Sequence, residues 1–266
     1  YFHMESTVEI NDFLIQNEIG EGSFGEVYKV RNKKTGEIYA AKISFKSWKE
    51  NSEKSVRDLA REVNILSKMN HPSILKFIGF SSVNFHNEPK PVIITDFLPN
   101  GSLYDVIELE KKGLSRIEWD DTRKLINIYG IASAMLYLHS HNIIHRDLKP
   151  GNILMDDFLF PKIADFGLSK IKHQNEDSMT MDSTLTMKGT PVYMAPEIWG
   201  NTEYTYACDV YAFSIIVYEI MTCQDPYPSS GFFDICMKVL NGYRPEINDM
   251  IPDAYKNLIE SCWAQD

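Results

Sequence analysis

The spacing of hydrophobic residues changes about a third of the way along this 266-residue chain. Two short β-prone runs, residues 26–31 and 38–43, flank a Lys34-Thr35-Gly36 turn and predict a hairpin. Apolar residues three or four positions apart over 54–69 predict a helix, and two strand-like runs follow at 74–80 and 92–97. We therefore expect a β-rich first segment with one main helix.

Helical spacing dominates after Asn100-Gly101-Ser102, which is a loop signal. Residues 122–140 carry one stripe, made of Leu125, Ile128, Ala132, Met135 and His139. Residues 207–222 are apolar nearly all round, as in a helix buried within a domain. A mostly β segment followed by a mostly α segment predicts an α+β fold of two lobes with a cleft between them.

Composition narrows the class of protein. The chain is 44% hydrophobic and 24% charged, which is ordinary for a globular protein, and its net charge of -10 disfavours bulk electrostatic binding to nucleic acid. Four widely spaced cysteines suit free thiols in a reducing compartment. No apolar run approaches the ~18 residues of a membrane span, and the start has no signal-peptide core, so we expect a cytoplasmic protein. Residues 1–4 are expected to be an added remnant before the native start.

A glycine-rich stretch, Gly20-Glu21-Gly22-Ser23-Phe24-Gly25, could bring backbone N–H groups close to phosphates. In a dinucleotide-binding fold a helix would follow this motif, whereas here a strand follows. A flexible glycine-rich hairpin is the alternative interpretation.

Two charged residues fall on positions that face apolar surroundings. Lys42 shares a strand face with Ala40, and Glu62 lies on the inward stripe of the predicted helix. Each charge would be costly to bury alone, and a pair would offset that cost. The alternative is two unrelated surface charges.

A dense polar loop carries the most specific signal. His145-Arg146-Asp147-Leu148-Lys149-Pro150-Gly151-Asn152 is followed by Asp165-Phe166-Gly167. Asp147 can accept a proton, Lys149 can offset phosphate charge, and Asn152 and Asp165 offer oxygen ligands to Mg²⁺. A loop that only satisfies its own hydrogen bonds is the alternative.

Together with Ala40-Ala41-Lys42 and Ala195-Pro196-Glu197, these motifs resemble the eukaryotic protein kinase family from about residue 13 to the end of the chain. The resemblance implies an N-lobe over about 13–95, a hinge over about 96–101 and a C-lobe over about 102–266, ending before the family's final helix. It implies ATP and Mg²⁺ as cofactors.

The resemblance also assigns roles. Asp147 would be the catalytic base, supported by Lys149 and Asn152, while Glu62 would hold Lys42 against the phosphates. Asn152 and Asp165 would hold Mg²⁺. The implied ATP-binding residues are Ile19, Gly20, Gly22, Ser23, Gly25, Val27, Ala40, Lys42, Thr95, Asp96, Leu98, Leu154 and Asp165.

Short sequence motifs indicate whether such a kinase would phosphorylate serine and threonine or tyrosine. Lys149 and the Thr190 segment resemble serine/threonine kinases, whereas Cys262-Trp263 and the Asp209 segment resemble tyrosine kinases and tyrosine-kinase-like chains. The combination best fits the tyrosine-kinase-like group, which phosphorylates mainly serine and threonine of proteins. Dual specificity and a pseudokinase scaffold remain alternatives, although no residue that catalysis needs is lost.

The segment between Asp165 and Glu197 is rich in hydroxyls. The resemblance places an activating phosphate at Thr186, with Thr184 and Ser183 as the next choices, and Arg146 and Lys170 as its cationic partners. Autophosphorylation in trans, by transient self-association, is expected. Asp58 stands where some relatives have a third cation, which weakens this pocket.

Overall fold

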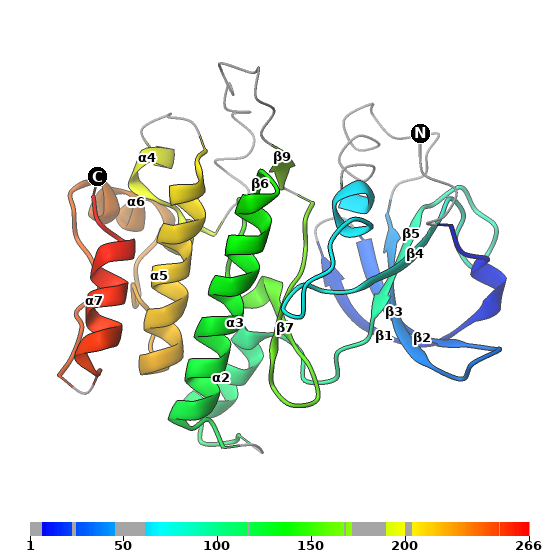
Figure 1. Cartoon of the computed structure of the whole chain (residues 1–266), viewed down its shortest axis with the longest axis horizontal. Helices are drawn as coiled ribbons and strands as arrows, with labels where there is room; N and C mark the ends of the chain where they lie inside the picture. Colours follow the sequence, from blue (N-terminus) through cyan, green and yellow to red (C-terminus); the bar gives the residue numbers. More distant parts are fainter. Residues whose placement is uncertain are drawn as a thin grey trace. The chain divides into compact units, whose positions relative to one another are not determined.

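The computed structural model describes residues 7–22, 25–45, 62–115, 118–167, 169–171, 190–199, 204–249 and 251–265. The chain divides into two compact units, residues 1–99 with 165–167, and residues 100–164 with 168–266. The first, the sheet unit, holds a five-stranded sheet, and the second, the helical unit, holds helices α2 to α7 (Figure 1). This composition confirms the predicted α+β class.

The sheet unit contains β1 (Phe13–Gly22), β2 (Gly25–Asn32), β3 (Ile38–Ser44), β4 (Phe77–Ser81) and β5 (Val92–Asp96). They pair antiparallel in the order β1-β2-β3-β5-β4. The predicted hairpin is confirmed, and Gly36 takes the positive φ of 77° that its turn requires. β4 begins three residues later than predicted, because the Ile74 N–H bonds to the His71 carbonyl in a turn that precedes the strand.

The helix predicted over 54–69 is described only in its last part. Residues 62–66 are helical and residues 67 and 68 form a turn. The predicted helix therefore ends earlier than the apolar spacing suggested, and residues 54–61 lie outside the described part.

The two faces of the sheet have different roles. One face carries a core that includes Val30, Ala41 and Val92, covered by a segment with Val8 and by the short helix η2 (Ile10–Asp12). That segment is tied down where the Val8 N–H donates to the Phe80 carbonyl at 2.9 Å. Because side chains alternate along a strand, the opposite face is left for the residues of the candidate site.

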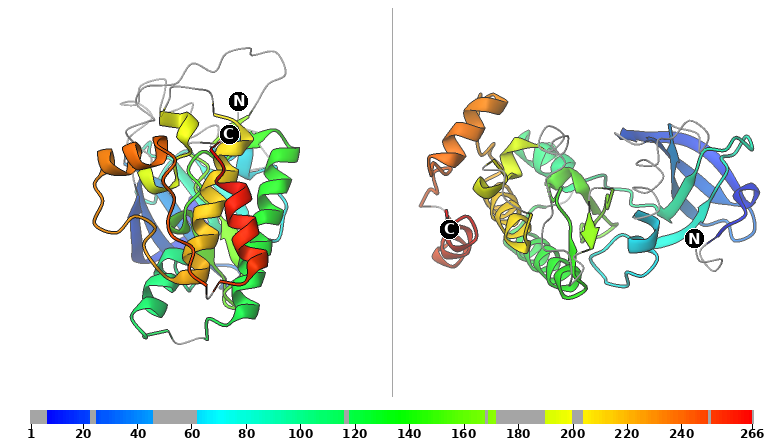
Figure 2. Two further views of the ribbon diagram at one scale, coloured as in Figure 1. Left: turned by 90° about the vertical axis from the view of Figure 1, so that its left-hand side faces the viewer. Right: turned by 90° about the horizontal axis from the view of Figure 1, so that it is seen from above.

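The helical unit contains α2 (Leu103–Lys111), α3 (Asp121–Ser140), α4 (Pro196–Trp199), α5 (Tyr206–Thr222), α6 (Phe232–Leu240) and α7 (Asp253–Cys262). α5 packs against both α3 and α7 and lies between them (Figures 1 and 2). It is buried along most of its length, as its apolar sequence predicted. Thr205 caps its start by accepting a hydrogen bond from the Ala207 N–H.

The buried apolar stripe predicted for α3 is wrong at its first residue, Leu125. Leu125 is 53% exposed, whereas Ile131, Ala134 and Leu138 are fully buried. Two overlapping stripes are possible in this apolar helix, and the one that packs against α5 and β8 is buried.

Short elements frame the polar loop. β6 (Ile143–Ile144) pairs with β9 (Lys170–Ile171), and β7 (Ile153–Met155) pairs with β8 (Pro161–Ile163). Two 3-10 helices, η3 (Pro150–Asn152) and η4 (Pro191–Tyr193), also belong to the helical unit. All four cysteines are free thiols, and no helix in the described ranges has the length and hydropathy to cross a bilayer.

Candidate functional site

Lys42, Glu62 and Asp165 form a charged cluster in the sheet unit. The Lys42 Nζ lies 3.0 Å from a carboxylate oxygen of Glu62 and 3.6 Å from one of Asp165. Burial lowers the pKa of Lys42, but the two carboxylates outweigh that effect and raise its pKa above the ordinary value. The ammonium therefore stays charged, with its position fixed by the buried Glu62.

The register of the sheet places further predicted residues on the face that carries Lys42. Val27 lies opposite Lys42, and Ala40 lies opposite Thr95. Side chains at paired positions share a face, so these four line one surface. Ile19 comes just before the glycine-rich turn and is 43% exposed.

The segment after β5 leaves backbone groups available. The Asp96 N–H donates to the Lys76 carbonyl at 3.0 Å. In the part of the chain that the structure describes, the backbone N–H and carbonyl of Leu98 have no hydrogen-bond partner. They can bind the edge of a planar ligand.

The glycine-rich stretch closes the β1–β2 hairpin, where Gly20 pairs with Val27 and Gly22 with Gly25. A Cβ on Gly25 would overlap the carbonyl oxygen of Ile43, so only glycine permits this close approach of β2 to β3. No heavy atom lies within 4 Å of the Cβ position of Gly20, which leaves open space beside that backbone. Ser23 lies outside the described residues.

The helical unit brings Asp147, Lys149 and Asn152 together. The Lys149 ammonium lies 2.9 Å from Asp147 Oδ2, and the Asn152 amide nitrogen donates to the backbone carbonyl and Oδ2 of Asp147 at 2.7 and 2.9 Å. Across the described ranges no group donates to the amide oxygen of Asn152. The side chain is thus oriented by its nitrogen, with its oxygen available as a ligand.

His145 fixes the start of this loop. Its ring is fully buried, with Nε2 3.0 Å from the Ala164 carbonyl oxygen and Nδ1 3.4 Å from the Asp147 backbone nitrogen. This geometry assigns the ring proton to Nε2, because the carbonyl can only accept. The Ala164 N–H in turn donates to the Asn152 carbonyl at 2.8 Å.

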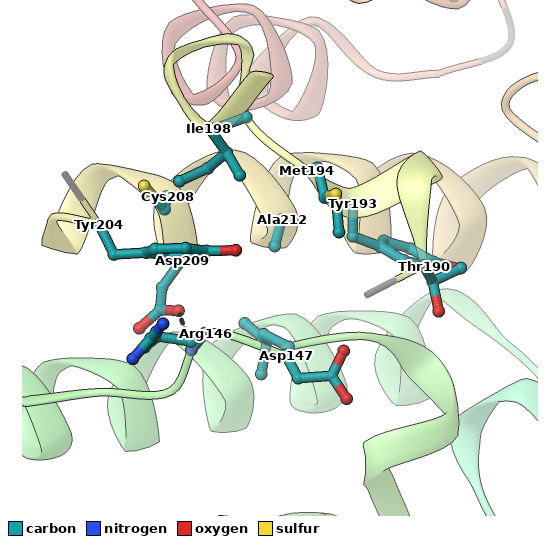
Figure 3. Close-up of a pocket in the computed structure, with 12 residues that line it drawn as sticks. Arg146, Asp147, Thr190, Tyr193, Met194, Ile198, Tyr204, Cys208, Asp209 and Ala212 are labelled. Carbon is teal, nitrogen blue, oxygen red and sulfur yellow. Dashed lines mark hydrogen bonds between the residues drawn. The ribbon is translucent and has the colours of Figure 1, made fainter. Parts of the chain in front are cut away.

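Asp209, near the start of α5, is a site residue that the sequence reasoning missed. It is 1% exposed and accepts from the backbone N–H groups of His145 and Arg146 at 2.8 and 2.9 Å. It also lies 2.9 Å from Nε2 of His139. Figure 3 shows its carboxylate directed at Arg146. An acidic residue inside an apolar helix was the available signal, since such a charge needs partners.

A second buried acid of α5, Glu219, was also missed. The Tyr193 hydroxyl lies 2.9 and 3.1 Å from its two carboxylate oxygens. Burial raises the pKa of Glu219 to about 8, although the hydrogen bond from Tyr193 acts in the opposite direction. This contact ties η4, which follows Thr190, to the buried helix.

Some predicted residues are not brought together by described geometry. Leu154 lies in β7 of the helical unit, while the other predicted adenine contacts belong to the sheet unit. Thr186, Thr184 and Ser183 lie outside the described residues, as does Asp58.

Comparison with known proteins gives one family. The family model described as "Protein kinase domain" matches residues 13–266. The chain is 36% identical over 96% of its length to a mimivirus protein named as a serine/threonine-protein kinase/receptor, R818, from Acanthamoeba polyphaga mimivirus. It is 35% identical over 97% of its length to "Probable serine/threonine-protein kinase drkC" of Dictyostelium discoideum. It is also 33% identical over 96% of its length to "Probable serine/threonine-protein kinase SIS8" of Arabidopsis thaliana.

The chain spans 14%, 33% and 23% of the length of these three relatives, in the order given, so most of each relative lies outside the match.

Proposed function

Because the chain belongs to the protein kinase domain family, we propose that it transfers the γ-phosphoryl group of ATP to serine or threonine hydroxyls of protein substrates. The observation that carries the proposal is the Asp147–Lys149–Asn152 arrangement, in which an ammonium and an amide each hold the Asp147 carboxylate at 2.9 Å. The names of the relatives above support the choice of hydroxyl. The sequence markers around Lys149 and Cys262 favour the tyrosine-kinase-like group.

We take the sheet unit as the N-lobe and the helical unit as the C-lobe. In the sheet unit, the charged Lys42 binds phosphate oxygens, and Glu62 keeps the ammonium in place. Gly20, Gly22, Ser23 and Gly25 cover the phosphates. Leu98 offers backbone groups to the base edge, next to Asp96 and beyond Thr95.

The adenine would lie against the apolar side chains of Ile19, Val27, Ala40 and Leu154. Three of these come from the sheet unit, where Val27 and Ala40 share the Lys42 face. Leu154, from β7, is the contribution of the helical unit.

In the helical unit, Asp147 orients the substrate hydroxyl and accepts its proton. Lys149 holds the carboxylate before transfer and offsets the charge of the phosphoryl group during it. Both groups sit on a loop whose backbone is fixed by His145 and Asp209.

The donor set fits Mg²⁺, a hard cation that prefers oxygen ligands. Asn152 has an amide oxygen with no donor within the described residues, and Asp165 supplies a carboxylate. When bound, the ion neutralises phosphate charge.

Activation is proposed to depend on a phosphate at Thr186, with Thr184 and Ser183 as alternatives, placed by one copy of the chain on another. Arg146 and Lys170 would be its cationic partners. The phosphate would order the loop by charge-assisted hydrogen bonds.

The test is to incubate the chain with labelled ATP, Mg²⁺ and a mixed protein substrate, and then identify the phosphorylated residue type. Asp147→Asn is the matched control, because it keeps the size of the side chain and removes the base. We expect label on serine and threonine for the wild type and almost none for Asp147→Asn, with ATP binding retained by both. ATP binding without transfer by the wild type would favour the pseudokinase scaffold, and label on tyrosine as well would favour dual specificity.

A further inference from the structure

We propose that Tyr204 is a positioning residue for Asp147: its ring holds the Arg146 guanidinium and thereby fixes the backbone turn from which Asp147 projects. The proposal rests on the function proposed above. It goes beyond it by assigning a role to a residue outside the catalytic loop.

The contact is between a cation and the face of an aromatic ring. The guanidinium carbon of Arg146 lies 4.4 Å from the centroid of the Tyr204 ring, within the range of a cation–π interaction. Burial raises the pKa of Tyr204, with Arg146 acting in the opposite direction, so the phenol stays neutral. Figure 3 shows the Tyr204 ring extending above the Arg146 side chain.

Arg146 needs such support because its backbone is strained. Its φ of 71° lies in the left-handed region, which residues with a Cβ seldom occupy. Conformations of this kind persist only where neighbouring groups hold them. Asp209 holds the backbone N–H of Arg146 at 2.9 Å, and Tyr204 holds the far end of the side chain.

Both supports come from the start of one rigid element. Tyr204 immediately precedes Thr205, the N-cap of α5, and Asp209 lies in the first turn of α5. The buried helix therefore carries a two-point clamp on Arg146. Asp147 is the next residue, so its direction depends on the φ and ψ angles that the clamp fixes.

There is little spare room around this clamp. Arg146, Asp147, Tyr204 and Asp209 line one cavity of about 20 Å³, which is enough for a single water molecule. A smaller side chain at position 204 would open this space to water, and the guanidinium would exchange the ring for solvent. Phenylalanine would keep the ring face and remove only the hydroxyl.

The experiment compares Tyr204→Leu and Tyr204→Phe with the wild type in the kinase assay. We expect Tyr204→Leu to lower kcat about tenfold and leave KM for ATP within about twofold, while Tyr204→Phe keeps kcat within about twofold of the wild type. Tyr129→Leu is the control for loss of a tyrosine from the helical unit, since Tyr129 is 73% exposed on α3. In an Arg146→Gln background, Tyr204→Leu should add little, because glutamine has neither the charge nor the guanidinium plane that the ring contacts.

A second measurement does not depend on phosphoryl transfer. In ¹⁵N NMR spectra, the Arg146 Nε–H resonance, assigned by its loss in Arg146→Lys, should be shifted by the ring current in the wild type and in Tyr204→Phe. In Tyr204→Leu it should lose this ring-current shift. An unmoved resonance, an unchanged kcat, or an equal loss of kcat in the Arg146→Gln background would overturn the role of Tyr204. Absence of transfer by the wild type, with the resonance shifted as expected, would count against the kinase function alone.

Discussion

Replacing Glu219 by glutamine should make the protein more stable, and increasingly so as the pH rises. Glu219 is 7% exposed, and burial raises the pKa of its carboxyl from the usual 4.5 to about 8. The folded protein therefore holds this proton more tightly than the unfolded chain does. Its contribution to stability is greatest below pH 4.5 and is lost as the pH rises towards 8.

The size of the effect follows from the difference between the pKa of Glu219 in the unfolded chain and its pKa in the folded protein. Each pKa unit corresponds to ~1.4 kcal/mol, so the ionised Glu219 lowers the free energy of unfolding by a few kcal/mol, about 5 at most. Glutamine cannot ionise, and its amide oxygen can still accept from the Tyr193 hydroxyl. The difference in stability between Glu219→Gln and wild type should thus grow by about 2 to 4 kcal/mol from about pH 5 to about pH 8.5.

Urea unfolding at several pH values, followed by tryptophan fluorescence, measures this difference. Trp119 and Trp263 are buried in the same helical unit as Glu219, so the signal reports on the affected region. Asp157→Asn is the control, because it makes the same change from carboxylate to amide at an exposed position. A difference between Glu219→Gln and wild type that stays constant from about pH 5 to about pH 8.5 would refute the reasoning.

Three further changes test other parts of the site. Lys42→Met should reduce ATP binding, measured by calorimetry, and lower the thermal midpoint, because it leaves Glu62 buried without its cation at a cost of ~3 kcal/mol or more. Asp209→Asn should cost ~2 kcal/mol in urea unfolding and lower kcat, since an amide nitrogen would face one of the backbone N–H groups that the carboxylate now accepts from. Thr186→Ala should lower activity about tenfold while ATP binding persists, and mass spectrometry that finds Thr186 always unmodified in active protein would contradict this.

The elements that were predicted correctly are those specified by local sequence. The β2–β3 hairpin follows from a short glycine turn between alternating residues, and α5 follows from an apolar run too long for a strand. The contact of Lys42 with Glu62 could be anticipated because neither charge can be buried alone. In α3, by contrast, two apolar stripes overlap, and only packing against α5 decides which is buried.

The supports of the catalytic loop depend on contacts between distant residues. Asp209 meets the backbone of His145 across 64 positions of sequence, and no local pattern specifies that pairing. The raised pKa of Glu219 arises from the depth of burial, which exists only in the folded protein. Both acids lie in an apolar helix. Because a buried acid needs hydrogen-bond or charge partners, this position in the sequence does indicate that each acid has a partner, but not which residue it is.

The segment that contains Val8 and η2 covers one face of the sheet, and this limits how the domain can be shortened or joined to other proteins. Val8 and Ile10 pack on the core residues Val30, Ala41 and Val92, although they precede the first long strand. A fragment that began at Phe13 would present this apolar surface to water and invite aggregation. Among the described residues, Thr7 makes the first backbone contact of this segment with the sheet, a β-bridge to Phe80, so an N-terminal fusion or cleavage site should preserve the chain from Thr7 onward.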